Sequence, residues 1–328
     1  SECPWRQNPG LSIDIDSSFG RRFYRLKRTT TIEPFATAYG IFDAPTPMRQ
    51  LHLPSMLSRQ SSTSMTPTIA NEDVLTRRNF LAAGIPMLWS PLVEAIFRTQ
   101  ILSQQQRDPR LTARPGRPTI PAPRGAVTVE TDKGRGGILY VPDQYQPTLP
   151  APLIVALHGG GGRARSWERL YEPCEKHGIV LLAPESRGRT WDAIQGMFGS
   201  DVVFLDSALQ YVFSRCAIDP EKIALAGFSD GASYALSLGP SNGDLFTRLI
   251  GFSPGFSYPE DPIIGRPKVF ISHGTEDRVL PVALSRDGIA PMFDMDGYTI
   301  HYEEFTGGHE MPPEVVAKAL DWFLESEP

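Results

Sequence analysis

The sequence holds few of the residues from which disulfide frameworks, metal sites and membrane spans are built. It has 3 cysteines in 328 residues, and they lack the paired spacing of a zinc site. No apolar run reaches the roughly 20 residues that a membrane-spanning helix needs. The net charge is −5, with no basic cluster where the core is expected. We therefore expect no zinc site, no stable membrane insertion and no nucleic-acid partner.

The scarcity of cysteine still leaves one question open. Cys174 and Cys216 lie in stretches of helical character, where they are expected as buried small hydrophobic residues. A bridge between these two is an alternative if the protein is exported to an oxidising compartment. Hydrophobic residues make up 41% of the chain and charged residues 21%, a composition that supports a packed core. Nothing in the sequence indicates an oligomeric state.

Residues 1–125 differ in composition from the rest. Residues 1–75 show no sustained hydrophobic period, so we expect a disordered or non-native extension, with Met65 as an alternative start. Residues 101–125 are rich in proline, glutamine and arginine, which favours an extended linker with no chemistry of its own. The catalytic domain is expected over residues 126–328.

Between these two stretches lies a paired arginine. Arg77 and Arg78 are followed by Phe80-Leu81 and then by a modest apolar stretch. The order resembles a twin-arginine export signal, expected over residues 76–100. It predicts a periplasmic or secreted protein, and otherwise a cytoplasmic one. Glu94 and the lack of a clean cleavage site depart from the pattern, and a short amphipathic helix is the alternative interpretation.

From residue 126 onward, apolar strands alternate with helical segments. The alternation predicts an α/β fold, with a mostly parallel sheet covered by helices on both faces and no large lid domain. In such sheets the ligand site lies at the carboxyl ends of the strands. The strands are expected at residues 127–129, 137–141, 153–157, 178–183, 223–226, 248–252, 268–272 and 298–305.

The pattern Gly227-Phe228-Ser229-Asp230-Gly231 lies between a predicted strand and a predicted helix. In a chain with 29 glycines the pattern by itself is weak. A strand before it and a helix after it are the context in which a serine is presented as a nucleophile. Small residues two positions on either side let the strand and the helix approach each other. We therefore predict Ser229 as a nucleophile.

Two further side chains follow predicted strands in the order expected for such a site. Asp277 follows the strand at 268–272, with Glu276 as its fallback, and His309 follows Gly307-Gly308 after the last strand. His309 would take the serine proton, and Asp277 would orient the imidazole. The other histidines are expected to be structural, His158 and His273 as supports of the loops that they begin: His52, His158, His177, His273 and His301.

An acyl-transfer site also needs donors for a developing oxyanion. The backbone N–H of Asp230, directly after the serine, is one expected donor. The other is expected from the glycine-rich run at residues 158–162, with Gly160 as the candidate. Read as a phosphate cradle, this run fails, because no Gly-Lys-Ser/Thr follows it.

These motifs together resemble the serine α/β-hydrolases over residues 136–324. Within these hydrolases, the motifs resemble those of the phospholipase/carboxylesterase group most. They also resemble those of the polyhydroxyalkanoate-depolymerase and feruloyl-esterase-like group. The resemblance implies hydrolysis of carboxylic esters through a Ser-His-Asp triad and an acyl-enzyme, without a metal or an organic cofactor. Asp230 stands where many relatives carry glutamine, and its charge is expected to disfavour anionic substrates. The motifs are at residues 157–161, 227–231, 273–277 and 307–312.

The substrate is less well indicated than the reaction. Short-chain or soluble esters are favoured, because little chain is available for a lid. Thioesterase, lysophospholipase and peptidase activities are alternatives with the same machinery, and a non-catalytic binding module is an alternative of another class. Aromatic and methionine side chains in the loops are expected to line a pocket, although core packing is an equal interpretation for most of them: Trp167, Trp191, Phe228 and Met311.

Overall fold

The computed structural model describes residues 12–16, 23–27, 108–130 and 135–325. The predicted export signal at residues 76–100 therefore lies outside the described residues. Strands β1 (Ser12–Asp16) and β2 (Phe23–Lys27) pair antiparallel within the stretch for which no regular structure is predicted. The missed signal is the alternation of apolar and polar residues in Ser12–Asp16, which has the period of a strand.

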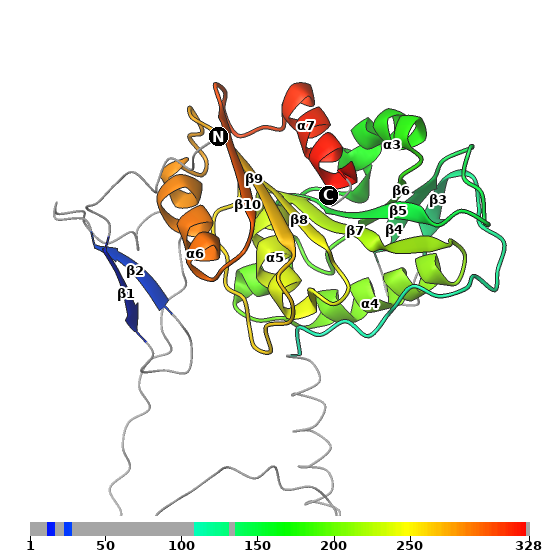
Figure 1. Ribbon diagram of the computed structural model, residues 1–328, viewed down its shortest axis with the longest axis horizontal. Helices are drawn as coiled ribbons and strands as arrows, with labels where there is room; N and C mark the ends of the chain where they lie inside the picture. The colour runs from blue at the N-terminus through cyan, green and yellow to red at the C-terminus, as the bar shows by residue number, and fades with distance from the viewer. Residues whose placement is uncertain (1–11, 17–22, 28–107, 131–134, 326–328) are drawn as a thin grey trace, which may run out of the picture. The chain divides into compact units, whose positions relative to one another are not determined.

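A central sheet of eight strands carries the rest of the described chain, and it contains all of the predicted strands (Figure 1). Its order is β10-β9-β8-β7-β5-β6-β4-β3. Strand β4 pairs antiparallel with both of its neighbours, β3 and β6, and all other neighbouring strands pair parallel. The predicted α/β-hydrolase fold is confirmed. The bounds are β3 Gly125–Val129, β4 Gly137–Val141, β5 Ala151–Leu157, β6 Val180–Pro184, β7 Ile218–Phe228, β8 Arg248–Phe252, β9 Lys268–Gly274 and β10 Ile300–Phe305.

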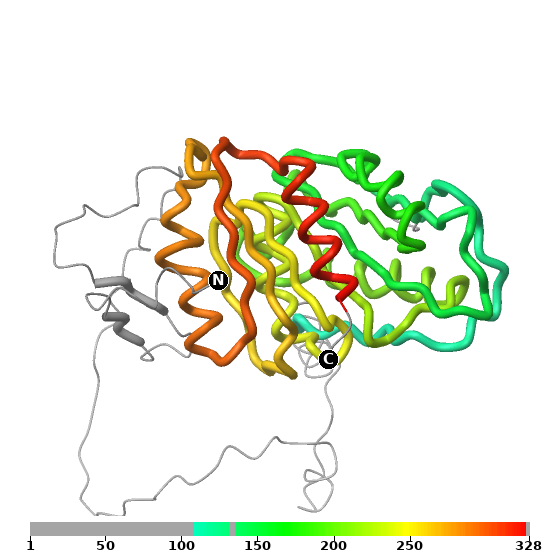
Figure 2. Tube along the Cα trace, turned by 45° about the horizontal axis from the view of Figure 1, so that its top comes forward, coloured from blue at the N-terminus to red at the C-terminus, as the bar shows by residue number. Residues whose placement is uncertain are grey.

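Helices cover both faces of this sheet, because its central strands are apolar on both sides. One core cluster packs α4 (Ser200–Phe213), α5 (Asp230–Leu238) and α6 (Ala290–Met295) against the sheet. The other packs α3 (Tyr171–His177) and α7 (Pro313–Leu324), and Figure 2 shows α7, in red, lying across that face. The two layers fix the strand ends, from which the loops of the site leave.

The two described cysteines lie on opposite sides of the sheet. Cys174 belongs to the cluster under α3 and α7, whereas Cys216 belongs to the cluster under α4. Both are free thiols, so the alternative of a bridge between them is wrong. Burial raises the pKa of each thiol to about 12, which keeps both protonated and unreactive.

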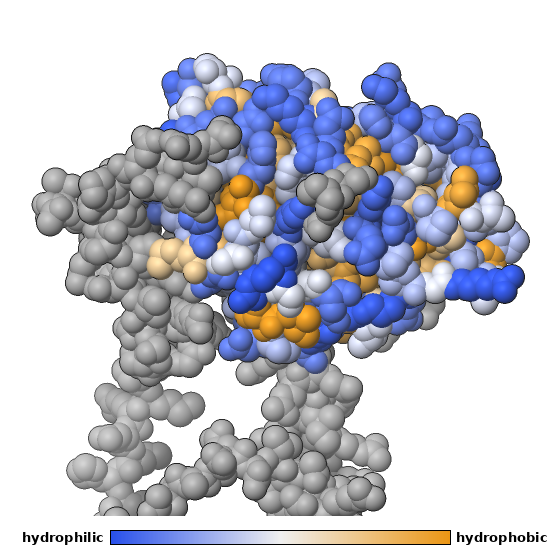
Figure 3. All heavy atoms as spheres, viewed as in Figure 1, coloured by the Kyte–Doolittle hydropathy of each residue, from blue (hydrophilic) through white to orange (hydrophobic). Residues whose placement is uncertain are grey.

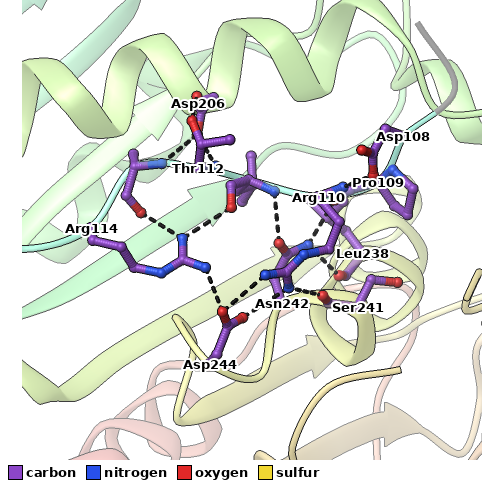
Figure 4. Close-up of polar contacts among 12 residues, drawn as sticks. Asp108, Pro109, Arg110, Thr112, Arg114, Asp206, Leu238, Ser241, Asn242 and Asp244 are labelled. Atoms are coloured by element: carbon purple, nitrogen blue, oxygen red, sulfur yellow. Dashed lines mark hydrogen bonds and ion pairs between the residues drawn. The ribbon is translucent and has the colours of Figure 1, made fainter. Parts of the chain in front are cut away.

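Residues 108–114 form a strap that packs on the catalytic domain. Leu111 is 1% exposed and Ala113 is 5% exposed. Asp206 on α4 accepts hydrogen bonds from the backbone N–H of Thr112 at 2.6 Å and of Ala113 at 2.7 Å (Figure 4). The predicted linker at residues 101–125 is therefore wrong over this part. Dense prolines indicate an extended backbone, and they do not say whether that backbone is free or docked.

Asn242 ties the strap to the turn after α5. Its buried side-chain oxygen accepts the backbone N–H of Leu111 at 2.8 Å, and its nitrogen donates to the carbonyl of Pro109 at 2.8 Å. Beside it, Asp244 pairs with Arg110 at 2.8 Å and with Arg114 at 2.5 Å (Figure 4). Because Asn242 is fully buried, we expect the hydrogen bonds of its amide to contribute more to the free energy of unfolding than the half-exposed ion pairs do.

The described part of the chain has short helices, of which α4 with 14 residues is the longest. None of its helices is long and apolar enough to cross a bilayer. On the face drawn in Figure 3, hydrophobic residues appear in separate patches between hydrophilic ones. Among the same residues, no three side chains of metal-binding type gather into a cluster.

We predict that Asn242→Ala lowers the free energy of unfolding by about 1–3 kcal/mol, because it leaves the backbone groups of Pro109 and Leu111 buried without a partner. Urea denaturation measures the loss, and trypsin should cut the variant faster after Arg110. Asp108→Ala is the control on the same strap, because it removes only an exposed contact. Equal stability and equal cleavage in wild type and Asn242→Ala would contradict the account.

Candidate active site

Ser229 occupies a strained turn between β7 and α5. Its φ of 56° and ψ of −120° lie outside the regions that L-residues prefer. The backbone N–H of Ser229 donates to the carbonyl of Phe252 at 2.9 Å, which holds the turn to the neighbouring strand. A Cβ added at Gly227 would lie 2.2 Å from the backbone of Gly231, so strand and helix touch there. The predicted elbow geometry is present.

Asp277 and His309 meet in the structure. Nδ1 of His309 donates to Oδ2 of Asp277 at 2.6 Å. Oδ1 of Asp277 accepts the backbone N–H groups of Val279 and Leu280, each at 2.8 Å. Burial opposes ionisation of Asp277 most strongly, but these hydrogen bonds together outweigh it and lower the pKa of the carboxyl. Glu276, the fallback acid, is exposed and makes no such contact.

The loop that carries His309 is anchored beside the acid. The backbone N–H of Glu276 donates to the carbonyl of Gly307 at 2.9 Å. A Cβ at Gly274 would lie 2.3 Å from the carbonyl oxygen of Gly308, so the two loops require glycine where they cross. The rings of His309 and Phe228 lie 4.8 Å apart. Because Phe228 directly precedes Ser229, this contact places the imidazole at the elbow.

The glycine-rich loop after β5 is braced by buried polar contacts. Nδ1 of His158 lies 2.8 Å from the carbonyl oxygen of Gly159, and its Nε2 accepts the backbone N–H of Ser186 at 3.1 Å. Nε1 of Trp191 donates to the His158 carbonyl at 2.8 Å. Burial lowers the pKa of His158, which favours the neutral ring that these contacts require. His158 supports the loop, as the sequence predicts.

The two predicted oxyanion donors lie on segments that converge. A Cβ at Gly159 would lie 3.3 Å from Cβ of Ser229, so the loop passes directly over the serine. A Cβ at Gly160 would lie 2.5 Å from Oδ2 of Asp230. Thr190 donates its hydroxyl to the same oxygen at 2.6 Å. The loop and the first turn of α5 thus form one wall beside Ser229, with the carboxylate of Asp230 in it.

Three of the four predicted pocket residues are buried in the core. Trp167 is 1% exposed and packs between the sheet and α7, Trp191 is 0% exposed, and Met311 is 9% exposed. The prediction that these side chains contact substrate is wrong, because the core already encloses them. Phe228 is half-buried, and its ring contacts His309. An aromatic residue in a loop gives no sequence signal that separates packing from exposure.

Sequence analysis does not indicate the pair of carboxylates behind this wall, the buried Asp201 and the half-buried Asp192. Asp201 accepts the backbone N–H groups of Arg187 at 2.6 Å and Asp192 at 2.7 Å. Asp192 in turn accepts the backbone N–H of Asp201 at 2.8 Å and the hydroxyl of Tyr234, on α5, at 3.2 Å. The pair links the loop after β6 to the helix behind Ser229. Its only signal in the sequence is an acid near a helix start, which is common.

The chain is similar in sequence to proteins that are named as esterases. No family model matches the chain. A "Probable feruloyl esterase C" of Aspergillus oryzae is 31% identical over 158 residues, which are 44% of this chain and 55% of the relative. Its namesake in Aspergillus niger is 27% identical over 199 residues, which are 56% and 66% of the two chains. The chain thus spans between half and two thirds of the length of these curated relatives.

One solved structure shows the same fold. It is described as a Staphylococcus aureus fluorophosphonate-binding serine hydrolase, FphF. It aligns with a TM-score of 0.50 and 14% sequence identity, and it covers 63% of this chain and 100% of its own. The resemblance to serine α/β-hydrolases is confirmed. Of the two groups that the sequence resembles, the names of the relatives above point to the second, the feruloyl-esterase-like group.

We predict a pH-dependent contribution of Asp201 to stability. Burial raises its pKa from 3.8 to about 6 in the folded protein. The folded state therefore binds this proton more tightly than the unfolded state, so the contribution is present below about pH 4 and is lost as pH rises through about 6. Relative to Asp201→Asn, which carries no charge, wild type should gain about 2 kcal/mol between pH 8 and pH 4.5. Urea denaturation of both proteins at these two pH values measures the change, and a gap that stays constant would contradict the prediction.

Proposed function

We propose that the chain is a carboxylic ester hydrolase that works through a Ser229–His309–Asp277 triad and an acyl-enzyme. The observation that carries the proposal is the 2.6 Å hydrogen bond from His309 to Asp277, with the His309 ring packed on the residue before Ser229. The names of the relatives, feruloyl esterases of two Aspergillus species, support the same class of reaction.

The first half of the reaction forms the acyl-enzyme. The Ser229 oxygen attacks the ester carbonyl carbon while Nε2 of His309 takes the hydroxyl proton. Asp277 accepts a hydrogen bond from the Nδ1–H of His309 and stabilises the imidazolium that results. The carbonyl oxygen becomes an oxyanion, for which the backbone N–H groups of Gly160 and Asp230 are the proposed donors. Such a donor contributes about 2.7–4 kcal/mol in a serine protease. The bond to the alcohol then breaks, and His309 returns its proton to the leaving oxygen.

The second half regenerates the enzyme. A water molecule attacks the acyl carbon, and Nε2 of His309 takes a proton from it as general base. The same two N–H groups are proposed to hold the second oxyanion. When the bond to the Ser229 oxygen breaks, His309 gives the proton back to that oxygen and the carboxylic acid leaves. No redox step occurs, and water is the only co-reactant.

We propose soluble esters of short or hydroxycinnamic acids as substrates. The relatives' names supply the hydroxycinnamic class. In place of the buried tryptophans, three apolar side chains on loops that follow strands are the proposed contacts. Val279 is exposed two residues after Asp277, Met197 is exposed after β6, and the backbone of Phe256 contacts Ser233 in the first turn of α5. All three lie on loops at the carboxyl edge of the sheet, where ligands of this fold bind.

A substrate panel tests the class and separates the alternatives. It contains p-nitrophenyl acetate, butyrate and octanoate, methyl ferulate, an acyl thioester and a lysophospholipid. Preference for methyl ferulate or the short esters supports the proposal, whereas preference for the thioester or the lysophospholipid would reassign the substrate. No turnover, together with no labelling by a fluorophosphonate, would favour a binding module. Export through residues 76–100 stays a prediction, and a reporter fused to those residues tests it.

We predict that Ser229→Ala lowers kcat/KM on p-nitrophenyl butyrate by about 10⁴-fold or more, because it removes the nucleophile. Ser207→Ala is the matched control, since Ser207 is an exposed serine on α4. It should leave kcat/KM unchanged. Residual activity of Ser229→Ala within tenfold of wild type would contradict the assignment of the nucleophile.

A second prediction concerns the carboxylate of Asp230. Its charge repels an anionic acyl group, so Asp230→Asn should raise kcat/KM for p-nitrophenyl hemisuccinate relative to p-nitrophenyl butyrate by about 3- to 10-fold. Thr190→Val is the control, because it removes the hydrogen bond to Asp230 and keeps the charge. An unchanged ratio of the two substrates in Asp230→Asn would show that this carboxylate does not discriminate between them.

A further inference from the structure

A second histidine lies behind the acid of the proposed triad. His273 is 0% exposed and stands near the end of β9, four residues before Asp277. Its Nε2 lies 2.7 Å from the carbonyl oxygen of Leu280 and 3.3 Å from Oδ2 of Asp277. This carboxylate oxygen is the one that accepts the hydrogen bond from Nδ1 of His309. The same oxygen atom therefore faces two imidazoles.

The contacts fix which nitrogen of His273 carries the hydrogen. A carbonyl oxygen can only accept, so Nε2 must be the donor toward Leu280 and Asp277. Burial lowers the pKa of His273 and favours its neutral form, which leaves Nδ1 without a hydrogen. Nδ1 lies 2.7 Å from the hydroxyl of Ser285, which must then be its donor. Ser285 is also 0% exposed and begins a π-helical turn, a form that is rare in helices.

We propose that His273 is a positioning residue that acts through Asp277, and that its Nε2–H sets how strongly Asp277 holds the proton of His309. The proposal rests on the proposed function and deepens it. Oδ2 of Asp277 divides its negative charge between two N–H donors, and Ser285 keeps the second donor in the correct tautomer. Without the Nε2–H of His273, more of that charge would act on His309, and the imidazolium would be stabilised too strongly.

The other charged groups nearby stay the same when His273 alone is changed. Glu304, on β10, pairs in register with His273 and forms an ion pair with Arg286. Tyr302 donates its hydroxyl to the same carboxylate at 2.8 Å. Glu276 and Arg278 flank Asp277 in the sequence, and both are exposed. A shift that depends on which nitrogen is restored at position 273 therefore reports the contact to Asp277.

Two amide variants separate the two sides of the ring. Glutamine places its side-chain nitrogen as many bonds from the backbone as Nε2 of histidine, so His273→Gln can restore the donor to Asp277. Asparagine places its nitrogen near the site of Nδ1, so His273→Asn reaches only the Ser285 side. We expect His273→Asn to move the acid limb of kcat/KM to higher pH by about 0.5 unit. We expect His273→Gln to return the limb to within about 0.2 unit of wild type.

Two control variants test whether any structural change near His273 would by itself shift the pH profile. Ser272→Ala changes a buried serine next to His273 whose hydroxyl has no partner, so it should leave the acid limb in place. His301→Gln changes a half-exposed histidine of the neighbouring strand and should do the same. If both amide variants and both controls gave the wild-type profile, or if both amide variants shifted it equally, the proposal would be overturned.

A second measurement does not require activity. NMR titration of the full chain with ¹⁵N-labelled histidine follows the ring of His309, which His309→Ala identifies in the spectrum. The His309 titration should move to higher pH in His273→Asn and back in His273→Gln. If wild type hydrolysed no ester but the NMR titration moved as stated, the proposed function would fail while the role of His273 stood. If wild type were active and the titration did not move, the reverse would hold.

Discussion

The close packing of three backbone segments around Ser229 is the constraint on which the rest of the structure depends. A serine with a φ of 56° is costly, and such a backbone persists only where its surroundings hold it. Here Gly231 would place a Cβ 2.2 Å from the carbonyl oxygen of Leu157, and Gly227 meets Gly231. Because no side chain fits between β5, β7 and α5, the serine is presented at the carboxyl edge of the sheet. Every other element of the site is arranged around that point.

Two groups of hydrogen bonds, one on each side of Ser229, then position the side chains and the loop of the site. On one side, the buried carboxylate of Asp277 faces two backbone N–H donors and two imidazole N–H donors. These donors keep the carboxylate charged. On the other side, the contacts of His158 and Trp191 hold the glycine loop over Ser229. The two sides share no residue in these contacts. This division suits a reaction in which proton transfer and oxyanion binding act at different atoms of the substrate.

The sequence predicts the fold and the Asp277–His309 contact well, and it predicts the pocket and the strap poorly. Strand positions follow from apolar runs, and the chain order of serine, acid and histidine follows from the elbow. The prediction that Trp167 and Trp191 contact substrate is wrong because aromatic side chains in loops can pack inward. The pattern of residues around them does not reveal this packing. The prediction of a linker over residues 108–114 is wrong because a high density of prolines indicates an extended backbone and does not indicate whether that backbone packs on the domain. The members of the pairs His273–Ser285 and Asp192–Asp201 meet because the loop between them folds back, and no residue pattern in the sequence indicates that fold.

The most direct test of the central claim is the site of covalent capture. The full chain is treated with a fluorophosphonate, digested, and mapped by tandem mass spectrometry. The account predicts a single adduct on the Ser229 oxygen, formed more slowly by a factor of at least about 100 in His309→Ala, because the serine loses its base. An adduct on a different residue, or labelling of Ser229 at an unchanged rate in His309→Ala, would contradict it.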